Sequence, residues 1–168
     1  MGFHSLKDVL QEQLEDLHSA ETQLIDALPK MAQVAHHDEL RQAFEHHLEE
    51  TRDHLKRVEE AMGELGISKS SEVCKAMQGL IAEGEELIQK GGDPVAMDAA
   101  LIGAAQRVEH YEIAAYGTAR QLADDCGFDG IRDLMDQTLD EESQADKLLT
   151  KIATGGMFKA GVNQQATA

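Results

Sequence analysis

Residues 94–126, PVAMDAALIGAAQRVEHYEIAAYGTARQLADDC, predict one long helix whose apolar face carries two acidic residues. Asp93 and Pro94 suit the N-cap and the first turn of this helix. Glu109 and Glu112 are three residues apart and therefore lie on the same side of it. Their neighbours on that side are Ile102, Ala105, Ile113 and Tyr116. A carboxylate buried among such residues costs several kcal/mol unless positive charge lies beside it, so this stretch predicts a core helix with a cation nearby.

The first and the last predicted helices also carry acidic residues on their apolar faces. Glu21 lies within about 40° of the stripe of the first helix at 100° per residue. That stripe consists of Leu10, Leu14, Leu17, Leu28 and Ala32. Glu142 and Asp146, four residues apart, align with the apolar residues of the last helix, whereas the neighbouring Asp140 and Glu141 turn outward. Acidic side chains from three helices are therefore expected to face one core.

The second predicted helix adds two histidines. His47, Glu50 and His54 form one row at spacings of three and four residues, with the two histidines at the edge of its apolar face and Glu50 further round, toward the margin. An imidazole and a carboxylate one turn apart are a common ligand pair for iron, manganese or zinc. Either His47 with Glu50 or Glu50 with His54 supplies this pair. His46 and His110 point elsewhere and are expected at the surface.

Helical periodicity accounts for most of the chain. Helices are expected over residues 5–35, 38–65, 70–90, 94–126 and 130–153, with Asp38 and either Ser70 or Ser71 as N-caps and a kink at Pro29. Short turns join the first two and the last two long helices, and an extra helix lies between these hairpins. We therefore expect residues 1–155 to form an all-α, ferritin-like four-helix bundle with an additional helix in the long crossover. Residues 156–168 lack a periodic pattern and are expected to form a flexible C-terminal tail.

Composition narrows the classes of function. The 168 residues include 32 acidic and 15 basic ones, which give a formal net charge of −17. Such a surface repels nucleic acids and anionic membranes and concentrates cations. No signal-peptide core or long apolar run is found, so we expect a cytoplasmic protein. Cys74 and Cys126 have no CxxC spacing, which argues against a thiolate zinc site.

Four segments carry a resemblance to a known family. These are ETQLIDALPKMA, AFEHHLEETRDHLKRVEE, AALIGAAQRVEHYEIAAYGT and TLDEESQAD. They resemble the YciE/YciF-type bacterial stress proteins of the ferritin-like superfamily, which are close in fold to rubrerythrin. The resemblance covers the chain to about Ala153. It implies a four-helix bundle, a homodimer, and two iron or manganese ions per chain.

The resemblance also implies a ligand set. The superfamily pattern places ligands at Glu21, Glu50, Glu109, Glu112, Glu142 and Asp146, completed by His47 or His54. Two positions depart from that pattern. Asp53 stands where a Glu-x-x-His pair would have its histidine, and Asp146 replaces a histidine on the last helix. A centre richer in oxygen favours manganese or ferric iron.

The resemblance implies a stress protein whose dimetal centre reacts with dioxygen or hydrogen peroxide, or handles iron, as an oxidase or peroxidase-like oxidoreductase. Glu50 and Glu109 are the expected bridging carboxylates, and the chain carries no four-cysteine iron domain to supply electrons. The alternative from another class is a metal-free or structurally metallated helical dimer that acts as a stress-induced interaction module. A phosphotransfer bundle using His47 is disfavoured, because the surrounding carboxylates would repel a phosphoryl donor.

Overall fold

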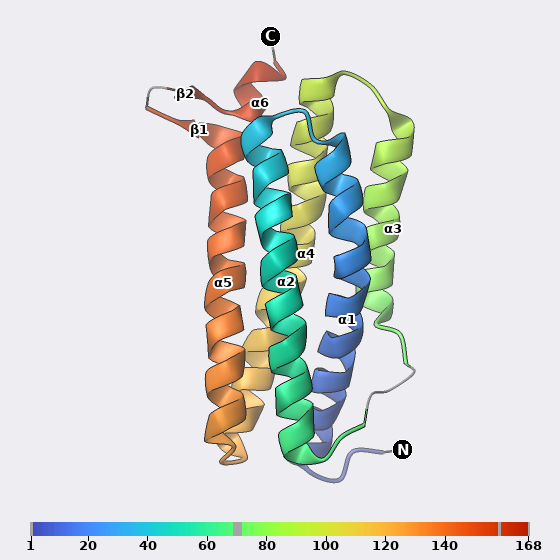
Figure 1. Cartoon of the computed structure of the whole chain (residues 1–168), viewed down its shortest axis with the longest axis vertical. Coiled ribbons are helices and arrows are strands. Elements are labelled where there is room, and N and C mark those ends of the chain that lie inside the picture. The colour runs from blue at the N-terminus through green and yellow to red at the C-terminus, as the bar shows by residue number, and fades with distance from the viewer. Residues whose placement is uncertain (1, 69–71, 158, 168) are drawn as a thin grey trace.

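The computed structural model describes residues 2–68, 72–157 and 159–167, which form a helical bundle (Figure 1). Its helices are α1 (Leu6–Val34), α2 (Asp38–Leu65), α3 (Lys75–Lys90), α4 (Pro94–Asp125), α5 (Asp129–Thr154) and α6 (Val162–Gln165). Two short strands, β1 (Gly155–Gly156) and β2 (Lys159–Ala160), pair antiparallel between α5 and α6. The prediction of an all-α bundle is confirmed.

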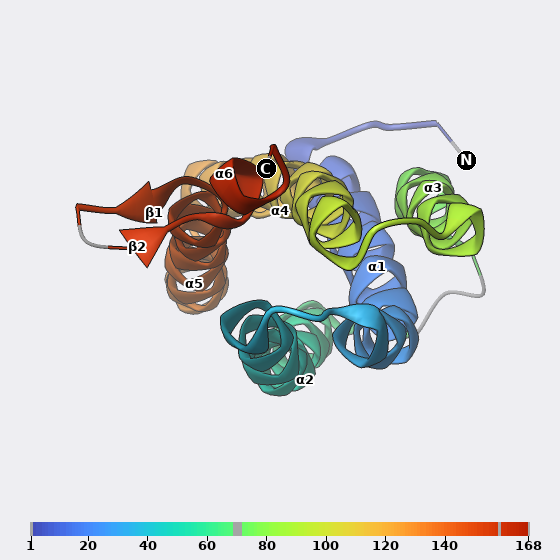
Figure 2. The same ribbon diagram turned by 90° about the horizontal axis from the view of Figure 1, so that it is seen from above.

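The four long helices are two antiparallel hairpins, α1 with α2 and α4 with α5 (Figure 1). Helix α3 lies in the connection between the hairpins and packs on the outside against α1 and α4 (Figure 2). The long crossover with an additional helix is therefore present as predicted. No helix within the described ranges is long and apolar enough to cross a bilayer.

Local capping signals fix most of the helix ends. Ser5 and Asp8 form a capping box at the start of α1, which continues through Pro29 to Val34. Gly66 ends α2 in the left-handed conformation, with φ 71°, which glycine adopts without steric cost. Asp93 accepts two backbone N–H bonds at the start of α4. These ends agree with the sequence prediction within one or two residues.

Two starts differ from the prediction. His37, rather than Asp38, is the N-cap of α2, because its extended backbone already leaves Asp38 in the first helical turn. There its carboxylate interacts favourably with the positive, N-terminal end of the helix dipole. Helix α3 begins directly after Cys74, whose side chain is the N-cap and accepts a hydrogen bond from the backbone N–H of Met77. The predicted caps Ser70 and Ser71 lie outside the described residues.

The C-terminal segment differs from the flexible tail that the sequence predicts for residues 156–168. Helix α6 packs against α4 and α5, and Val162 is completely buried. The chain folds back through β1 and β2 at a point where two glycines meet. A Cβ atom on Gly155 would lie only 2.3 Å from the backbone nitrogen of Gly161. The buried Val162, the contact between the two glycines and an ion pair from Lys159 to Glu39 hold this segment, and none of them leaves a helical period in the sequence.

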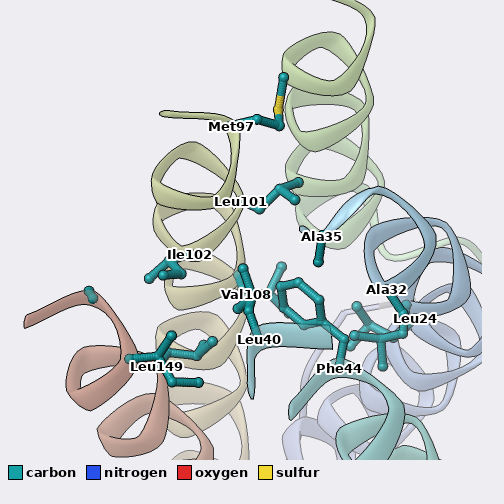
Figure 3. Packing of buried hydrophobic residues seen from close by; sticks show 14 of the residues in the cluster. Leu24, Ala32, Ala35, Leu40, Phe44, Met97, Leu101, Ile102, Val108 and Leu149 are labelled. Carbon is teal, nitrogen blue, oxygen red and sulfur yellow. The ribbon is translucent and has the colours of Figure 1, made fainter. Parts of the chain in front are cut away.

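The apolar core consists of two clusters at opposite ends of the bundle. The cluster near the α1–α2 turn includes Leu24, Leu40, Phe44, Leu101 and Leu149 (Figure 3). The cluster at the other end includes Leu10, Leu14, Val58, Ile131 and Met135. On each of the four long helices, the stretch between the two clusters carries buried polar residues. The bundle therefore has a polar layer at mid-length.

A separate buried carboxylate ties the α1–α2 turn to α4. Asp98 is 1% exposed, and its two oxygens accept the backbone N–H groups of His36 and His37 at 2.8 Å each. Asp98 is thus a buried acid that the protein itself satisfies.

Candidate metal centre

Six ionisable side chains from four helices meet in the polar layer, and we call them the mid-bundle cluster. They are Glu21 on α1, His47 and His54 on α2, Glu109 and Glu112 on α4, and Glu142 on α5. Each is at most 5% exposed. Helical periodicity explains the placement, since each residue falls on the inward stripe of its helix.

The mid-bundle cluster contains two overlapping groups of ligand atoms. In the first group, one atom from each residue lies within 4.8 Å of the others, and its members are His47, Glu109, Glu112 and Glu142. The second group, with the same spacing, consists of Glu21, His54 and Glu142. Glu142 belongs to both groups, so its carboxylate lies between them.

Each histidine turns one ring nitrogen toward the carboxylates. His47 Nε2 lies 3.5 Å from Glu109 Oε1 and 3.6 Å from Glu142 Oε2. His54 Nδ1 lies 2.9 Å from Glu142 Oε1 and 3.7 Å from Glu21 Oε1. The two rings are 6.1 Å apart between centroids. One imidazole therefore serves each group of ligand atoms.

Many of these buried atoms have no hydrogen-bond partner. Among the described residues, ten buried side-chain nitrogen and oxygen atoms lack one, and eight of the ten belong to the mid-bundle cluster. Two of the eight, His54 Nδ1 and Glu142 Oε1, lie 2.9 Å apart but are not oriented for a hydrogen bond. Both oxygens of Glu112 and both of Glu142 are among them. Because a buried polar atom without a partner destabilises the fold, the concentration of such atoms at one point indicates a ligand.

Neighbouring carboxylates hold the other nitrogen of each histidine. Glu141 Oε2 accepts a hydrogen bond from His54 Nε2 at 2.9 Å, and Arg57 pairs with the same carboxylate at 2.5 Å. Burial alone would raise the pKa of Glu141, but Arg57 and His54 outweigh it and hold that pKa below its ordinary value. Glu50 Oε2 lies 3.4 Å from His47 Nδ1. Carboxylates that contact histidines in this way fix which nitrogen faces a metal ion.

A tyrosine completes the second group. The Tyr116 hydroxyl, which is fully buried, donates a hydrogen bond to Glu21 Oε1. The other oxygen of Glu21 has no partner. Tyr116 therefore holds one oxygen of this carboxylate and leaves the second available to a ligand.

The electrostatics of the mid-bundle cluster show a demand for positive charge. Burial raises the pKa of Glu21 to about 7, although His54 opposes the shift. Burial also raises the pKa of Glu109 and of Glu112 well above the ordinary value, and in Glu112 the carboxylates of Glu142 and Glu21 add to it. Burial lowers the pKa of His47, but Glu109 and Glu142 outweigh this effect and raise it to about 10. Burial, together with the crowded negative charge, therefore favours the protonated forms of these groups. Glu142 is the exception, because the effect of burial on its pKa is outweighed by His47 and His54, which hold that pKa below the ordinary value.

Six of the eight ligands that the sequence predicts lie in the mid-bundle cluster, and two lie outside it. Glu50 is one quarter exposed and contacts His46 and His47. It lies beside Nδ1 of His47, whereas the other ring nitrogen of His47 faces the mid-bundle cluster. Asp146 accepts a hydrogen bond from Gln106 at 3.0 Å and lies 3.3 Å from His110. The structure places Glu142, rather than Glu50, between the two groups.

Two residues near the site differ from expectation or were missed. Glu141, predicted to turn outward, reaches across to His54 and Arg57 of α2. It lies on the flank of α5 where α2 packs, so a helical wheel of α5 alone places it outside. Arg57 is only 16% exposed and supplies a cation at depth, yet it pairs with Glu141 and not with the mid-bundle cluster. The sequence signal that could have identified Arg57 as half-buried is its position one residue before the apolar Val58.

Comparisons with known proteins agree with this fold. A family model described as a domain of unknown function (DUF892) matches residues 5–167. Protein YciF of Escherichia coli (strain K12) is 40% identical over 165 residues, which cover 98% of this chain and 99% of that protein.

Solved structures of related proteins have the same fold. The crystal structure of the E. coli stress protein YciF matches with a TM-score of 0.86 at 41% identity, covering 89% of this chain and 94% of that one. YcfI of Rhodopseudomonas palustris, described as a candidate structural protein, matches with a TM-score of 0.86 at 38% identity, covering 89% and 96% of the two chains. The chain therefore belongs to the DUF892 family of YciF-type proteins.

Proposed function

We propose that the mid-bundle cluster binds two iron or manganese ions per chain, and that the protein handles dioxygen, hydrogen peroxide or iron in the cytoplasm under stress. The proposal is carried by the eight buried atoms of this cluster that have no hydrogen-bond partner. Asp98 strengthens the inference, because it is buried to the same degree and both of its oxygens are satisfied.

The composition of the donor set fits two divalent ions. Four carboxylates carry four negative charges when ionised, and two divalent ions neutralise them. Carboxylates with imidazoles suit iron and manganese. Ferritin-like dimetal carboxylate proteins use four glutamates and two histidines, and the same inventory is present here. Its distribution differs, because α2 supplies both histidines and α5 supplies a single glutamate.

The two groups suggest which residues hold each ion. His47, Glu109 and Glu112 would hold one ion, Glu21 and His54 the other, and Glu142 would contact both. When bound, such a pair would supply redox chemistry toward a small oxidant.

The protein's own residues prepare this centre. The two apolar clusters above and below it exclude water from the two ends of the layer, which strengthens charge interactions within it. Arg57 and Glu141 fix the ring of His54 so that Nδ1 faces the carboxylates. Tyr116 positions Glu21 through a hydrogen bond and is the nearest phenol to the second group.

Metal analysis of protein purified without chelators tests the proposal. We expect about two ions per chain in the wild type, as a two-metal site requires. Glu142→Gln should lose most of the bound metal, because it removes the carboxylate common to both groups. Asp140→Asn is the matched control, since it removes one exposed charge from the same helix and should retain the metal.

A metal-free interaction module is the second candidate. Two exposed apolar residues of the α5 end favour it, Met157 at 90% and Leu148 at 40% exposure. A second copy of the chain, giving the expected homodimer, is one partner such a surface would suit. A wild type that carries no metal, and whose stability is the same with and without added iron or manganese, would favour this candidate over the first.

A further inference from the structure

A cavity of about 230 Å³ lies between α2 and α5 and reaches the mid-bundle cluster. Its polar lining consists of His46, His47, Glu50, Glu109 and Gln144, and apolar residues such as Phe44 and Leu149 complete the wall. Figure 2 shows α2 and α5 as neighbouring helices on the side of the bundle away from α3. The side chain of His46 is 69% exposed and that of Glu109 is 4% exposed, so the lining runs from the surface to the interior.

Glu50 connects the two ends of this cavity. Its Oε1 lies 3.2 Å from the exposed His46 Nε2, and its Oε2 lies 3.4 Å from the buried His47 Nδ1. Its own side chain is 25% exposed, between the exposures of the two histidines. The Glu50 carboxylate therefore contacts the solvent-exposed imidazole of His46 on one side and His47, a member of the mid-bundle cluster, on the other.

The deep end of the cavity has free ligand atoms. His47 Nε2 and Glu109 Oε2 are buried and have no hydrogen-bond partner. Both residues line the cavity and belong to the first ligand group. Within the mid-bundle cluster, these are the first atoms that an ion arriving through the cavity would meet.

We infer that this cavity is the access route for divalent cations, and that His46 and Glu50 take up the ion at its mouth and transfer it to His47 and Glu109. This inference rests on the proposed metal centre. A hydrated divalent ion cannot enter an apolar core in one step, because the loss of all its water is too costly. Ligands of graded exposure replace that water in stages.

The charge of the protein supports the same direction of transfer. A net charge of −17 raises the concentration of cations near the surface. At the mouth, water competes with His46 and Glu50 for the ion, so binding there is weak. The buried, unpartnered atoms of the mid-bundle cluster lack such competition, and the ion moves inward.

Loading kinetics of the metal-free full chain with Co²⁺ test the route, followed by the visible absorption of the bound ion. Glu50→Gln should slow loading by about tenfold or more, the lower end of the rate gain that focused charge gives. The glutamine oxygen can still accept from His47, so the number of ions bound at saturating Co²⁺ should stay the same, although the loss of this carboxylate weakens their affinity. Ala145→Phe, which fills the cavity without removing a charge, should also slow loading.

Glu49→Gln is the control, because it removes the same charge from the adjacent, exposed position and should load at the wild-type rate. Equal rates in Glu50→Gln and Glu49→Gln, or an unchanged rate in Ala145→Phe, would overturn the route and leave the metal centre intact. Loss of a bound ion at saturating Co²⁺ in Glu50→Gln would also overturn it, because Glu50 would then be a permanent ligand. A wild type that binds no Co²⁺, Fe²⁺ or Mn²⁺ would overturn both the route and the proposed function.

Discussion

Helix α4 buries carboxylates in two regions, and only one of them is satisfied by the protein. At its N-terminal end, Asp98 accepts two backbone N–H groups from the α1–α2 turn. Three to four turns further on, Glu112 is completely buried and neither of its oxygens has a partner. Burial alone therefore does not identify a functional acid. What distinguishes the mid-bundle region is burial without hydrogen-bond partners.

The comparison also separates two uses of a buried charge. Asp98 joins parts of the chain that are about 60 residues apart in sequence and so contributes to folding. Glu112 lies among Glu21, Glu109 and Glu142, whose negative charges oppose folding unless protons or metal ions neutralise them. Substitutions in the two regions should therefore change stability in opposite directions.

The largest effect is expected at Glu112. In metal-free protein, Glu112→Leu should raise the free energy of unfolding by about 1–4 kcal/mol, the range found when buried ion pairs are replaced by apolar residues of similar size. The reason is that the leucine removes two unpartnered oxygens. Denaturant unfolding in the presence of a chelator measures this, with Glu112→Gln as a control that keeps the polar atoms. A loss of stability in Glu112→Leu would show that the protein already satisfies this carboxyl group.

The opposite sign is expected at Asp98. Asp98→Ala should lower the free energy of unfolding by roughly 1.5–3 kcal/mol, the contribution of hydrogen bonds to a charged group. The change should be the same with and without Mn²⁺, because Asp98 is outside the mid-bundle cluster. Denaturant unfolding of the wild type and of Asp98→Ala, with and without Mn²⁺, measures this change. A dependence on Mn²⁺ would contradict the division between the two regions.

A smaller effect is expected at the residue that orients His54. Glu141→Gln should weaken metal binding about 10–100-fold, as is usual when a carboxylate that holds a ligand histidine is removed. Isothermal titration with Mn²⁺ measures the affinity, and Asp140→Asn on the same helix is the control. Wild-type affinity in Glu141→Gln would mean that His54 needs no carboxylate partner to face the site.

The smallest effect is expected at Asp146. Although the sequence places this residue on the inward stripe of α5, its carboxylate contacts Gln106 and His110. Asp146→Asn should change metal affinity by less than about threefold, far below the loss expected for an orienting or ligating carboxylate. A large loss in the same titration would return Asp146 to the ligand set that the family resemblance implies.

Helical periodicity predicts which residues face the core, and it does so well here. Glu21, Glu109 and Glu142 are buried as their positions on the apolar stripes require, and the long helices end where their glycines and caps indicate. The sequence alone thus leads to the bundle, to the extra helix and to the polar layer at mid-length.

Contacts between helices are harder to predict than faces of a helix. Asp146 lies at an inward angular position and Glu50 toward the margin of the apolar face, and nearby polar groups hold both carboxylates away from the centre. Glu141 shows the reverse case, since it lies at an outward position of α5 and reaches α2 across the gap. Side-chain length and the angle between neighbouring helices decide these contacts, and the spacing of residues along one helix contains neither.

Anomalous diffraction from crystals grown with Mn²⁺ would locate the bound ions themselves. Two peaks are expected inside the polar layer, one beside His47 and Glu109 and the other beside His54 and Glu21, with Glu142 in contact with both. Peaks confined to surface carboxylates, or a mid-bundle cluster without any peak, would contradict the assignment of these buried acids to a metal centre.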